Sequence, residues 1–333
     1  MLQNRDFKAG ILGTGSFVPE NKLTNQDLEK MVDTSNEWIV SRTGIKERRI
    51  APQSMTTSYM ATEAAKKAIE DAGIEASEID LIIVATVVPD MNFPSTACLV
   101  QANIKATKAA AFDIEVGCSG FIYGLSIAKQ FVESGTYKTV LVIAADVLSK
   151  ITNWEDRNTC VLFGDGAGAA IVGPVKDGYG ILDNVIGADG TGGMHLYMPA
   201  GGSRMPASED TVKNKLHTIH MNGQEVFKFA VNVMNTATVE VLNRCGLKPE
   251  DVDLFIPHQA NIRIIDAAMK KLKLSKEKVF INLDKYGNMS AASVIVALDE
   301  ALKAGRIKNG DIILMVAFGA GLTWGSTVIK WLR

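Results

Sequence analysis

The sequence has few cysteines, almost no net charge and no long apolar run, and each shortage excludes a class of protein. Four cysteines in 333 residues form no CxxC pair and no dense framework. We therefore expect a reduced, cytoplasmic protein in which a special cysteine is reactive rather than bridged. The 35 Lys plus Arg against 37 Asp plus Glu give a net charge of −2, so global charge does not attract nucleic acid. Any basic docking surface must be local.

No stretch of the chain predicts a membrane segment. The longest apolar runs, such as residues 81–89 and 312–318, are far shorter than the roughly 20 residues that span a bilayer. The first six residues lack the apolar core of a signal peptide, so we expect none. With 47% hydrophobic and 22% charged residues, the composition is that of a soluble globular protein, and the length allows about two core-sized units.

Internal repeats indicate that the chain has two similar halves. Segments match in the same order at a spacing of 170 to 173 residues: 10–12 with 180–182, 73–83 with 246–256, and 118–135 with 288–305. Any α/β protein repeats strands, turns and helices, but three ordered matches favour a duplication. We therefore predict halves over residues 1–177 and 178–333. They should share one core, because no low-complexity linker separates them.

Hydrophobic patterning predicts an α/β sandwich for these halves. The predicted strands are continuous apolar runs, which suits strands that are covered on both faces. The two helices that begin near Cys118 and Asn288 are apolar on most sides, and a helix that is apolar all round is buried. We therefore expect two buried helices packed between two sheets.

Cys118 is the first candidate for chemistry. It lies in the turn Gly117-Cys118-Ser119-Gly120, between the apolar run 109–116 and a predicted helix. The positive end of the helix dipole and the free N–H groups favour a thiolate there, and small neighbours leave room for an acyl group. The alternative is a buried, inert cysteine, which is the commonest fate of this residue.

His258 and Asn288 are the second and third candidates. His258 follows the predicted strand 253–256 and therefore lies at a strand's carboxyl end, where α/β proteins place their sites. Asn288 occupies the position in the second half that Cys118 occupies in the first. The alternatives are a hydrogen-bonded structural histidine and an ordinary helix N-cap. The predicted pseudo-symmetry favours chemistry, because it brings the two helix N-termini face to face.

Four motifs of the chain carry a family resemblance. They are Gly117-Cys118-Ser119-Gly120-Phe121, Pro257-His258-Gln259-Ala260-Asn261, Tyr286-Gly287-Asn288-Met289-Ser290 and Phe318-Gly319-Ala320-Gly321-Leu322-Thr323-Trp324-Gly325. With the segments 36–38, 41–45 and 163–168, they closely resemble β-ketoacyl-acyl carrier protein synthase III, the initiating condensing enzyme of bacterial fatty acid synthesis. The resemblance covers the whole chain and implies a thiolase fold, in which two pseudo-symmetric halves form a five-layered α-β-α-β-α sandwich.

The resemblance implies an acyltransferase reaction and the residues that perform it. Cys118 would accept an acyl group from a short acyl-CoA, and the malonyl group of malonyl-acyl carrier protein would then lose carbon dioxide and attack that acyl group. A protonated His258 and the Asn288 amide would stabilise the enolate oxygen. Backbone N–H groups of Cys118 and Ala320 would bind the second oxyanion. The family usually has glycine in place of Ala320, which matters only if that position requires positive φ.

The resemblance also implies contacts to coenzyme A and to a second subunit. Trp38 and Arg157 resemble the pair that sandwiches the adenine, and Arg42 resembles a phosphate contact. The alternative for Trp38 is core packing. Phe93 resembles the residue that reaches across a homodimer and bounds the acyl pocket. No cofactor or metal is implied, since the CoA thioester is a substrate.

A local basic surface is predicted next to His258 for docking of the acidic carrier protein. Arg263, Lys270 and Lys271 have a helical spacing that can put them on one face. The residues of the predicted docking surface are Gln259, Ala260, Asn261, Ile262, Arg263, Lys228, Lys270 and Lys271. The alternative is an ordinary solvated helix face, which such charge runs usually form.

Other sites and enzyme classes fit the sequence less well. Gly13-Thr14-Gly15 lacks the third glycine of a dinucleotide-binding motif, and His217 and His220 lack a third zinc ligand nearby. A degradative thiolase needs a second catalytic cysteine, but no cysteine follows Cys245. Papain-like proteases have a different cysteine motif, and elongating condensing enzymes use a histidine where this chain has Asn288. A condensing enzyme with another starter and a non-catalytic acyl-CoA-binding protein stay open as alternatives.

Overall fold

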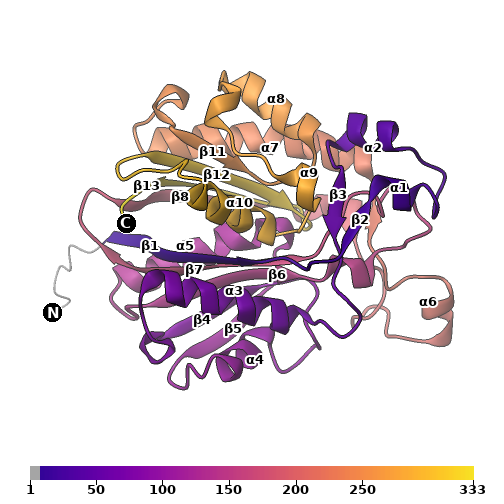
Figure 1. Cartoon of the computed structure of the whole chain (residues 1–333), viewed down its shortest axis with the longest axis horizontal. Coiled ribbons are helices and arrows are strands. Elements are labelled where there is room, and N and C mark those ends of the chain that lie inside the picture. The colour runs from indigo at the N-terminus through magenta and orange to yellow at the C-terminus, as the bar shows by residue number, and fades with distance from the viewer. Residues whose placement is uncertain (1–7) are drawn as a thin grey trace.

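The computed structural model describes residues 8–333 and is built on two main β-sheets that lie one above the other (Figure 1). The prediction that there is no signal peptide concerns residues outside this part of the chain. The first sheet has the order β1 (Lys8–Phe17), β7 (Gly166–Val175), β6 (Val140–Asp146), β4 (Leu81–Ala85) and β5 (Ala110–Ile114). The second has the order β8 (Gly180–Ala188), β13 (Thr323–Lys330), β12 (Ile312–Gly319) and β11 (Leu254–Pro257).

The two sheets share a strand order and a pattern of directions. In the first sheet, β4 is parallel to β5 and β6, and β7 is antiparallel to β6 and β1. In the second, β11 is parallel to β12, and β13 is antiparallel to β12 and β8. In the position of β5, the second sheet has a single parallel bridge between Phe255 and Val279. The predicted boundary at residues 177 and 178 lies between β7 and β8, and the matching order supports our proposal that the halves are duplicates.

Helices form three further layers around the sheets. α5 (Gly120–Glu133) and α10 (Ala292–Lys303) lie between the sheets and contact strands of both. The outer layers are α3 (Thr57–Ala72) and α4 (Thr96–Asn103) on the first sheet, and α7 (Gly223–Arg244) and α8 (Ile262–Leu272) on the second. The predicted five-layered α-β-α-β-α sandwich is confirmed.

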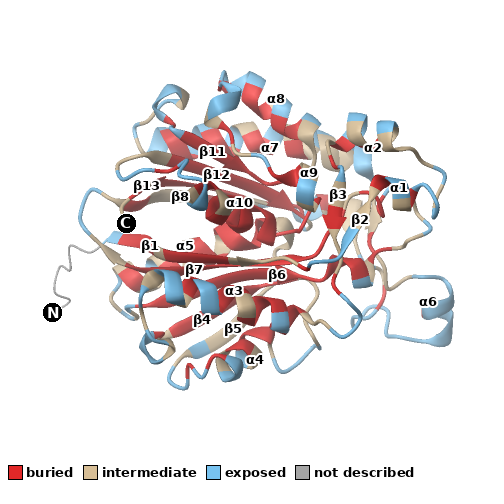
Figure 2. Ribbon diagram, viewed as in Figure 1, coloured by how far each residue is buried: buried red, intermediate tan, exposed pale blue. Residues whose placement is uncertain are grey.

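The central layer explains why its two helices are apolar on nearly every side. Phe121 and Leu125 of α5 and Ile295 and Leu298 of α10 are all fully buried, and Figure 2 shows α10 and the strands around it as mostly buried. A Cβ on Gly124 of α5 would lie 2.6 Å from a methyl group of β6, so this packing needs glycine. Burial of one large aliphatic or aromatic side chain stabilises by about 1.5–3 kcal/mol.

A peripheral unit between β1 and α3 carries part of the predicted coenzyme A site. Its elements are β2 (Lys22–Thr24), α1 (Asn25–Leu28), α2 (Asn36–Thr43) and β3 (Glu47–Arg49). Arg48 anchors the unit, because its fully buried guanidinium donates to Val161 O at 2.8 Å and to Asn25 Oδ1 at 2.9 Å. Burial lowers the pKa of Arg48 to about 10, so the group stays charged at neutral pH.

The remaining elements are short. An excursion after β8 contains β9 (Leu196–Tyr197), α6 (Glu209–Lys213) and β10 (His220–Met221), and α9 (Leu283–Tyr286) precedes α10. Figure 1 shows α6 projecting from one end of the molecule. Among the helices of residues 8–333, none combines the length and apolarity that a membrane crossing needs.

Candidate active site

Cys118 lies in a tight turn between β5 and α5. Gly117, at φ +56°, begins a 3₁₀ turn over Gly117–Ser119 that leads directly into α5. A Cβ on Gly117 would lie 2.6 Å from Ala320 N, so the turn can approach the loop after β12 only with glycine at this position. The sequence thus places Cys118 at the beginning of a buried helix, as predicted.

Hydrogen bonds tie this turn to the loop after β12. Ser119 Oγ and Thr323 Oγ1 are 2.7 Å apart, and both contact Val116 O, at 2.7 and 2.8 Å. The two loops therefore form one unit, although about 200 residues of chain separate them.

Ala320 is compatible with this loop. It is not among the residues with positive φ, whereas the next residue, Gly321, has φ +135°. Gly319 packs directly against Cys118 N. The N–H groups of Cys118 and Ala320 therefore belong to adjoining segments, and alanine can present its N–H as glycine would.

His258 follows β11 and is only 1% exposed. Its Nδ1 lies 2.6 Å from Ser293 Oγ of α10, and the Gln259 N–H donates to the same oxygen at 3.4 Å. A hydroxyl can donate to a ring nitrogen while its oxygen accepts from a backbone N–H, so we assign the Ser293 hydroxyl as the donor to Nδ1, and this tautomer leaves Nε2–H as the donor of the ring. Burial lowers the pKa of His258 to about 3. The predicted protonated ring is therefore wrong, but the neutral ring keeps one donor.

Asn288 is fixed in the turn before α10 by its backbone and its side chain. Its N–H donates to Leu162 O at 2.9 Å, and its carbonyl accepts from Gly164 N at 3.0 Å. Its side-chain Oδ1 accepts from Ser290 N at 2.9 Å. Because Oδ1 is occupied in this way, Nδ2 is the group that can donate to a ligand.

Cys118, His258 and Asn288 line one cavity of about 100 Å³. The rest of its lining is mostly apolar and includes Phe163 and Phe318. The Phe318 ring packs edge-on against the His258 ring, with centroids 5.2 Å apart. A nucleophile and two side-chain donors thus face a small apolar space, which suits a short acyl group with one carbonyl to be polarised.

The pKa of the Cys118 thiol is higher than we expected for a cysteine at a helix N-terminus. Burial raises the pKa of Cys118 to about 12. The Ser290 hydroxyl lowers this pKa and the Asp146 carboxylate raises it, but both effects are smaller than that of burial. Desolvation outweighs the favourable end of the helix. The predicted resting thiolate is therefore wrong: Cys118 rests as a thiol and must lose its proton as it reacts.

The predicted coenzyme A residues form a stack. The Arg157 Cζ lies 4.8 Å from the centroid of the Trp38 ring, and the Arg42 Cζ lies 5.6 Å from it. Arg157 also donates to Asp33 O at 2.7 Å. A base between ring and guanidinium needs two stacking distances, about 7 Å in all. Arg157 must therefore move aside before the predicted sandwich can form.

Phe93 is 85% exposed and is not among the residues that line the cavity of its own chain. It lies between β4 and α4, and the neighbouring β5 is the edge strand of the first sheet. Met91, two residues earlier, is also exposed, so this segment presents two large apolar side chains to solvent.

Gln259 does not lie on the predicted docking surface. It is fully buried, its Nε2 donates to Pro257 O at 2.7 Å and Phe280 O at 3.2 Å, and its Oε1 accepts from Asn282 N at 3.1 Å. The prediction of a carrier contact for Gln259 is therefore wrong. Its amide instead clamps the end of β11 to the segment that leads into α9.

The other predicted docking residues divide between the cavity and the surface. Ala260 and Asn261 line the cavity, and Ile262 packs against the C-terminal end of α2. Arg263 is exposed and its Cζ lies 5.4 Å from the centroid of Phe227, a cavity residue. A positive charge thus stands next to the cavity lining.

The three predicted lysines are all exposed. Lys270 and Lys271 are exposed in the last turn of α8. Lys228 is exposed on α7 and pairs with Glu225 at 2.7 Å, so part of its charge is compensated.

Three polar residues around the cavity did not emerge from the sequence. Ser293 orients His258, and Ser290 and Asp146 influence the Cys118 thiol. The signal for Asp146 was an acidic residue at the carboxyl end of an apolar strand, where functional groups of α/β proteins gather. Ser290 and Ser293 looked like ordinary helix-start residues.

The remaining sequence candidates have structural roles. His217 Nε2 lies 2.9 Å from Thr211 Oγ1, and the His220 ring packs on Tyr197. Within residues 8–333, no group of three potential metal ligands is present. Gly13 allows β1 to approach α3, because a Cβ there would lie 2.5 Å from the backbone of that helix.

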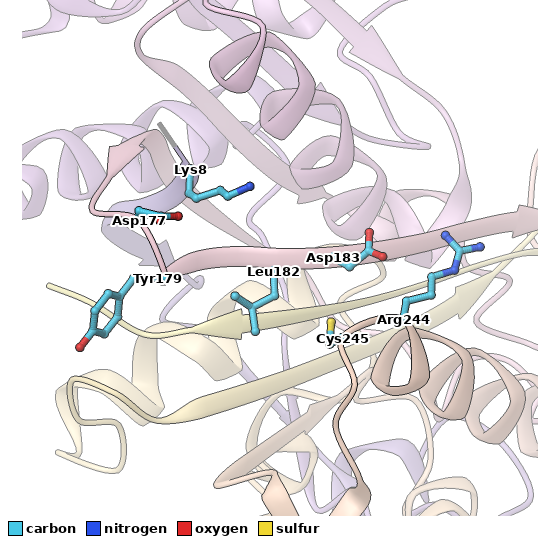
Figure 3. Close-up of a pocket in the computed structure, with 8 residues that line it drawn as sticks. Lys8, Asp177, Tyr179, Leu182, Asp183, Arg244 and Cys245 are labelled. Carbon is cyan, nitrogen blue, oxygen red and sulfur yellow. The ribbon is translucent and has the colours of Figure 1, made fainter. Parts of the chain in front are cut away.

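A second cavity, of about 230 Å³, lies near the end of α7 and the beginning of β8 (Figure 3). Lys8, Asp177, Asp183 and Arg244 give it charges of both signs, and Cys245 lies between α7 and β8. None of the three candidate catalytic residues lines it.

Comparison with known proteins reveals relatives over nearly the full length. Residues 112–190 match the family model described as 3-oxoacyl-[acyl-carrier-protein (ACP)] synthase III, and residues 242–331 match the model of its C-terminal region. A curated β-ketoacyl-[acyl-carrier-protein] synthase III from Caldanaerobacter subterraneus subsp. tengcongensis is 73% identical over 97% of this chain and 98% of its own length. One from Clostridioides difficile is 57% identical over 97% of this chain and 98% of its own.

A solved structure gives the same result for the fold. The crystal structure of 3-oxoacyl-[acyl-carrier-protein] synthase III from Aquifex aeolicus is 53% identical in sequence. It matches with a TM-score of 0.90 and covers 98% of this chain and 100% of that one.

Proposed function

The chain belongs to the 3-oxoacyl-[acyl-carrier-protein] synthase III family, and on this basis we propose that Cys118, His258 and Asn288 perform its reaction. The protein is an acyltransferase that condenses a short acyl-CoA with malonyl-acyl carrier protein and so starts fatty acid synthesis. The observation that carries the residue assignment is the single apolar cavity that all three side chains line.

In the first step, the Cys118 sulfur attacks the carbonyl carbon of the acyl-CoA. The bond between that carbon and the CoA sulfur breaks, and the acyl group stays on Cys118 as a thioester. The proton of the Cys118 thiol ends on the departing CoA sulfur, so the step is balanced. The N–H groups of Cys118 and Ala320 donate to the carbonyl oxygen while it carries negative charge.

In the second step, His258 and Asn288 polarise the malonyl thioester. The Nε2–H of His258 and the Nδ2–H of Asn288 donate to its carbonyl oxygen and stabilise the enolate that remains when carbon dioxide leaves. The electrons of the broken carbon–carbon bond become the enolate, so this step needs no general base. A neutral His258 is sufficient, because only its N–H is used.

In the third step, the enolate carbon attacks the acyl group on Cys118. A carbon–carbon bond forms, the bond to the Cys118 sulfur breaks, and a 3-ketoacyl thioester remains on the carrier protein. The Cys118 sulfur leaves as a thiolate, takes up one proton from solvent and returns to its resting thiol.

The stack on Trp38 supports a binding site for the adenine of coenzyme A. Arg157 would leave the ring and cover the other side of the base, so a planar cation replaces its contact with indole by one with adenine. Arg42, on the same helix as Trp38, would meet a phosphate.

The function is tested by incubation of the protein with radiolabelled acetyl-CoA, followed by peptide mapping. We expect one labelled peptide, the one that contains Cys118, and no label in Cys118→Ala. Cys98→Ala is the matched control, because Cys98 is an exposed cysteine outside the cavity. Label on another residue, or label that persists in Cys118→Ala, would contradict the assignment.

We propose that carrier docking uses Arg263 with Lys270, Lys271 and Lys228. Arg263→Glu should raise the KM for malonyl-acyl carrier protein several-fold and leave acylation by acyl-CoA nearly unchanged, because the charge acts on an acidic partner. The effect should shrink with added salt. Steady-state kinetics with each substrate at two salt concentrations measure it.

The control for this prediction is Lys66→Glu. It makes the same change of charge on α3, in the opposite outer layer. Equal loss with both substrates in Arg263→Glu would show a structural role instead of docking.

We propose a homodimer in which Phe93 of one chain borders the cavity of the other. Its exposure and the free edge at β5 support this arrangement, since an unpaired edge strand is a template for pairing. Sedimentation at micromolar concentration should give a dimer, and Phe93→Asp should lower condensation in proportion to the loss of dimer. A fully active monomer would refute the proposal.

A further inference from the structure

His258 and Asn288, the two donors that we assign to one carbonyl oxygen, are anchored in different halves of the molecule. The His258 N–H donates to Val316 O of β12 at 2.8 Å, which ties this residue to the second sheet. The backbone of Asn288 is instead hydrogen-bonded to Leu162 and Gly164 of the first half. Within residues 8–333, no hydrogen bond joins the two donor residues directly. Their relative position therefore depends on the segment that connects them.

Residues 279–287 form this connecting segment. It begins at the edge of the second sheet, where Val279 makes a parallel bridge with Phe255 of β11. It contains α9, which is only four residues long and ends two residues before Asn288. A helix of one turn is not stable by itself in water, so contacts with the rest of the fold must hold α9 in place.

Glu300 of α10 makes two such contacts, one at each end of α9. Its Oε2 accepts from Nδ2 of Asn282, the residue directly before α9, at 2.9 Å. Its Oε1 accepts from the hydroxyl of Tyr286, the last residue of α9, at 2.5 Å. Burial and the Glu300 carboxylate raise the pKa of Tyr286, so the hydroxyl keeps the proton that it donates. One carboxylate thus fixes both ends of α9 to α10.

The connecting segment is also bonded to the neighbours of His258. The Asn282 N–H donates to Oε1 of Gln259, the residue after His258, at 3.1 Å. The Nε2 of Gln259 donates to the carbonyl of Pro257, the residue before His258, at 2.7 Å. Asn282 is 1% exposed, so water does not compete for these contacts. It therefore connects the backbone around His258 with Glu300.

α10 contacts both donor segments with the same face. Ser293 Oγ lies 2.6 Å from His258 Nδ1. Ser293 and Glu300 are seven residues apart, or about two helical turns, so their side chains project from one side of the helix. The beginning of α10 thus meets the His258 ring, and its end meets the segment that leads to Asn288.

We propose that Glu300 is a positioning residue, which sets the relative position of the His258 and Asn288 donors by holding α9 against α10. Both donors have to reach one carbonyl oxygen of the malonyl thioester, and a displacement of about 1 Å can cost about 10²-fold in rate. Glu300 does not line the cavity, so it acts through Asn282 and Tyr286 and not on the substrate. This inference rests on the proposed roles of His258 and Asn288.

The effect of Glu300 should be confined to the steps that use the two donors. The turn of Cys118 is held by Ser119 and Thr323, which are bonded to each other and to Val116 O. Loss of Glu300 should therefore slow decarboxylation and condensation and leave acylation of Cys118 unchanged. A residue that only stabilises the fold would instead lower all these steps together, because it changes the fraction of folded protein.

The test measures decarboxylation of malonyl-acyl carrier protein and single-turnover acylation by radiolabelled acetyl-CoA on the same preparation. Glu300→Ala should lower decarboxylation about 10- to 10²-fold, with a normal rate of acylation. Glu300→Gln should recover most of the loss, because its Oε1 can accept from Asn282 and its Nε2 can donate to the Tyr286 oxygen. Tyr286→Phe removes only one of the two hydrogen bonds and should give a smaller loss of decarboxylation.

The matched control is Asp299→Ala. Asp299 is the neighbouring carboxylate on α10, but it accepts from the hydroxyls of Thr14 and Ser16 on β1, at 2.9 and 2.5 Å. Its loss should lower stability without any difference between decarboxylation and acylation.

The inference is refuted if Glu300→Ala lowers decarboxylation and acylation equally or lowers neither. If Glu300→Ala does not fold, Tyr286→Phe decides: a normal rate of decarboxylation refutes the inference, and a lowered one with normal acylation supports it. Asn288→Ala, measured alongside, tests the proposed function separately. If decarboxylation persists at the normal rate in Asn288→Ala, the donors themselves are assigned wrongly.

Discussion

The turns before α5 and α10 occupy equivalent places in the two halves, but they are built in opposite ways. Both begin with a glycine at positive φ, Gly117 at +56° and Gly287 at +65°. In the first turn, the next residue is Cys118, whose thiol faces the cavity. In the second, the next residue is Asn288, whose side chain accepts from the backbone of its own turn.

Because of this difference, the first turn can form a covalent bond to the substrate, whereas the second can only polarise the substrate carbonyl. Cys118 must be free to change its bonds, so its turn is held by other groups, Ser119 and Thr323. Asn288 only has to donate, so its own Oδ1 can serve as an anchor while Nδ2 points to the ligand. A duplicated scaffold thus supplies one turn for covalent chemistry and one for electrostatic stabilisation.

The largest expected effect comes from a change in the second turn. Asn288→Ala should lower condensation about 10²–10³-fold, the usual cost of one oxyanion donor, and leave acylation of Cys118 intact. Asn288→Asp should lower it further, because a carboxylate repels the enolate. Burst labelling and condensation rates measured on the same preparation separate the two steps. Loss of acylation in Asn288→Ala would contradict the assignment of acylation to the first turn alone.

A smaller effect concerns the thiol of the first turn. Because burial raises the pKa of Cys118 to about 12, its alkylation by iodoacetamide should increase about tenfold per pH unit from pH 7 to 9, without a plateau. Peptide mapping identifies the alkylated cysteine. A plateau below pH 9 would show that the helix N-terminus outweighs burial after all.

The smallest effect is on stability and should be shared by both turns. A Cβ on Gly117 would lie 2.6 Å from Ala320 N, and one on Gly287 would lie 2.8 Å from Leu162 O. Gly117→Ala and Gly287→Ala should each lower the free energy of unfolding by about 1–3 kcal/mol. Urea unfolding measures this cost.

Gly178→Ala is the control for these two variants. Gly178 has φ +80° but nothing within 4 Å of a Cβ, so it should lose only the smaller backbone part of that energy. Equal losses at all three glycines would mean that the close approach of the loops contributes little.

The layers and the family could be predicted from the sequence because they depend on local patterns. Apolar runs gave the strands, the all-round apolar helices gave the central layer, and short motifs gave the family. The cavity brings together Cys118, His258 and Asn288. Cys118 and Asn288 could be predicted because the repeat fixes where the two helix N-termini lie, and His258 because it follows a predicted strand.

Properties that depend on distant segments could not be predicted. Gln259 directly follows His258 and lies four residues before the exposed Arg263, so its sequence position suggests a surface residue. Its side chain is instead covered by residues 280–282, to which it is hydrogen-bonded. The protonation states of Cys118 and His258 reflect desolvation by the whole sandwich. Asp146 belongs to a strand that pairs with chain segments on both sides, and its neighbour Ser290 is far away in sequence.

The place of α5 and α10 between two sheets also decides where the molecule can move. Helices in the centre of a core open only with global unfolding, so backbone amides near the catalytic turns should be among the slowest to exchange with solvent. Substrate entry then cannot rely on motion of the catalytic groups themselves. It depends on the outer segments, on the unit around Trp38 and on the excursion with α6, which have fewer buried contacts. We therefore expect the slowest amide exchange at the reaction centre and faster exchange in the border around it.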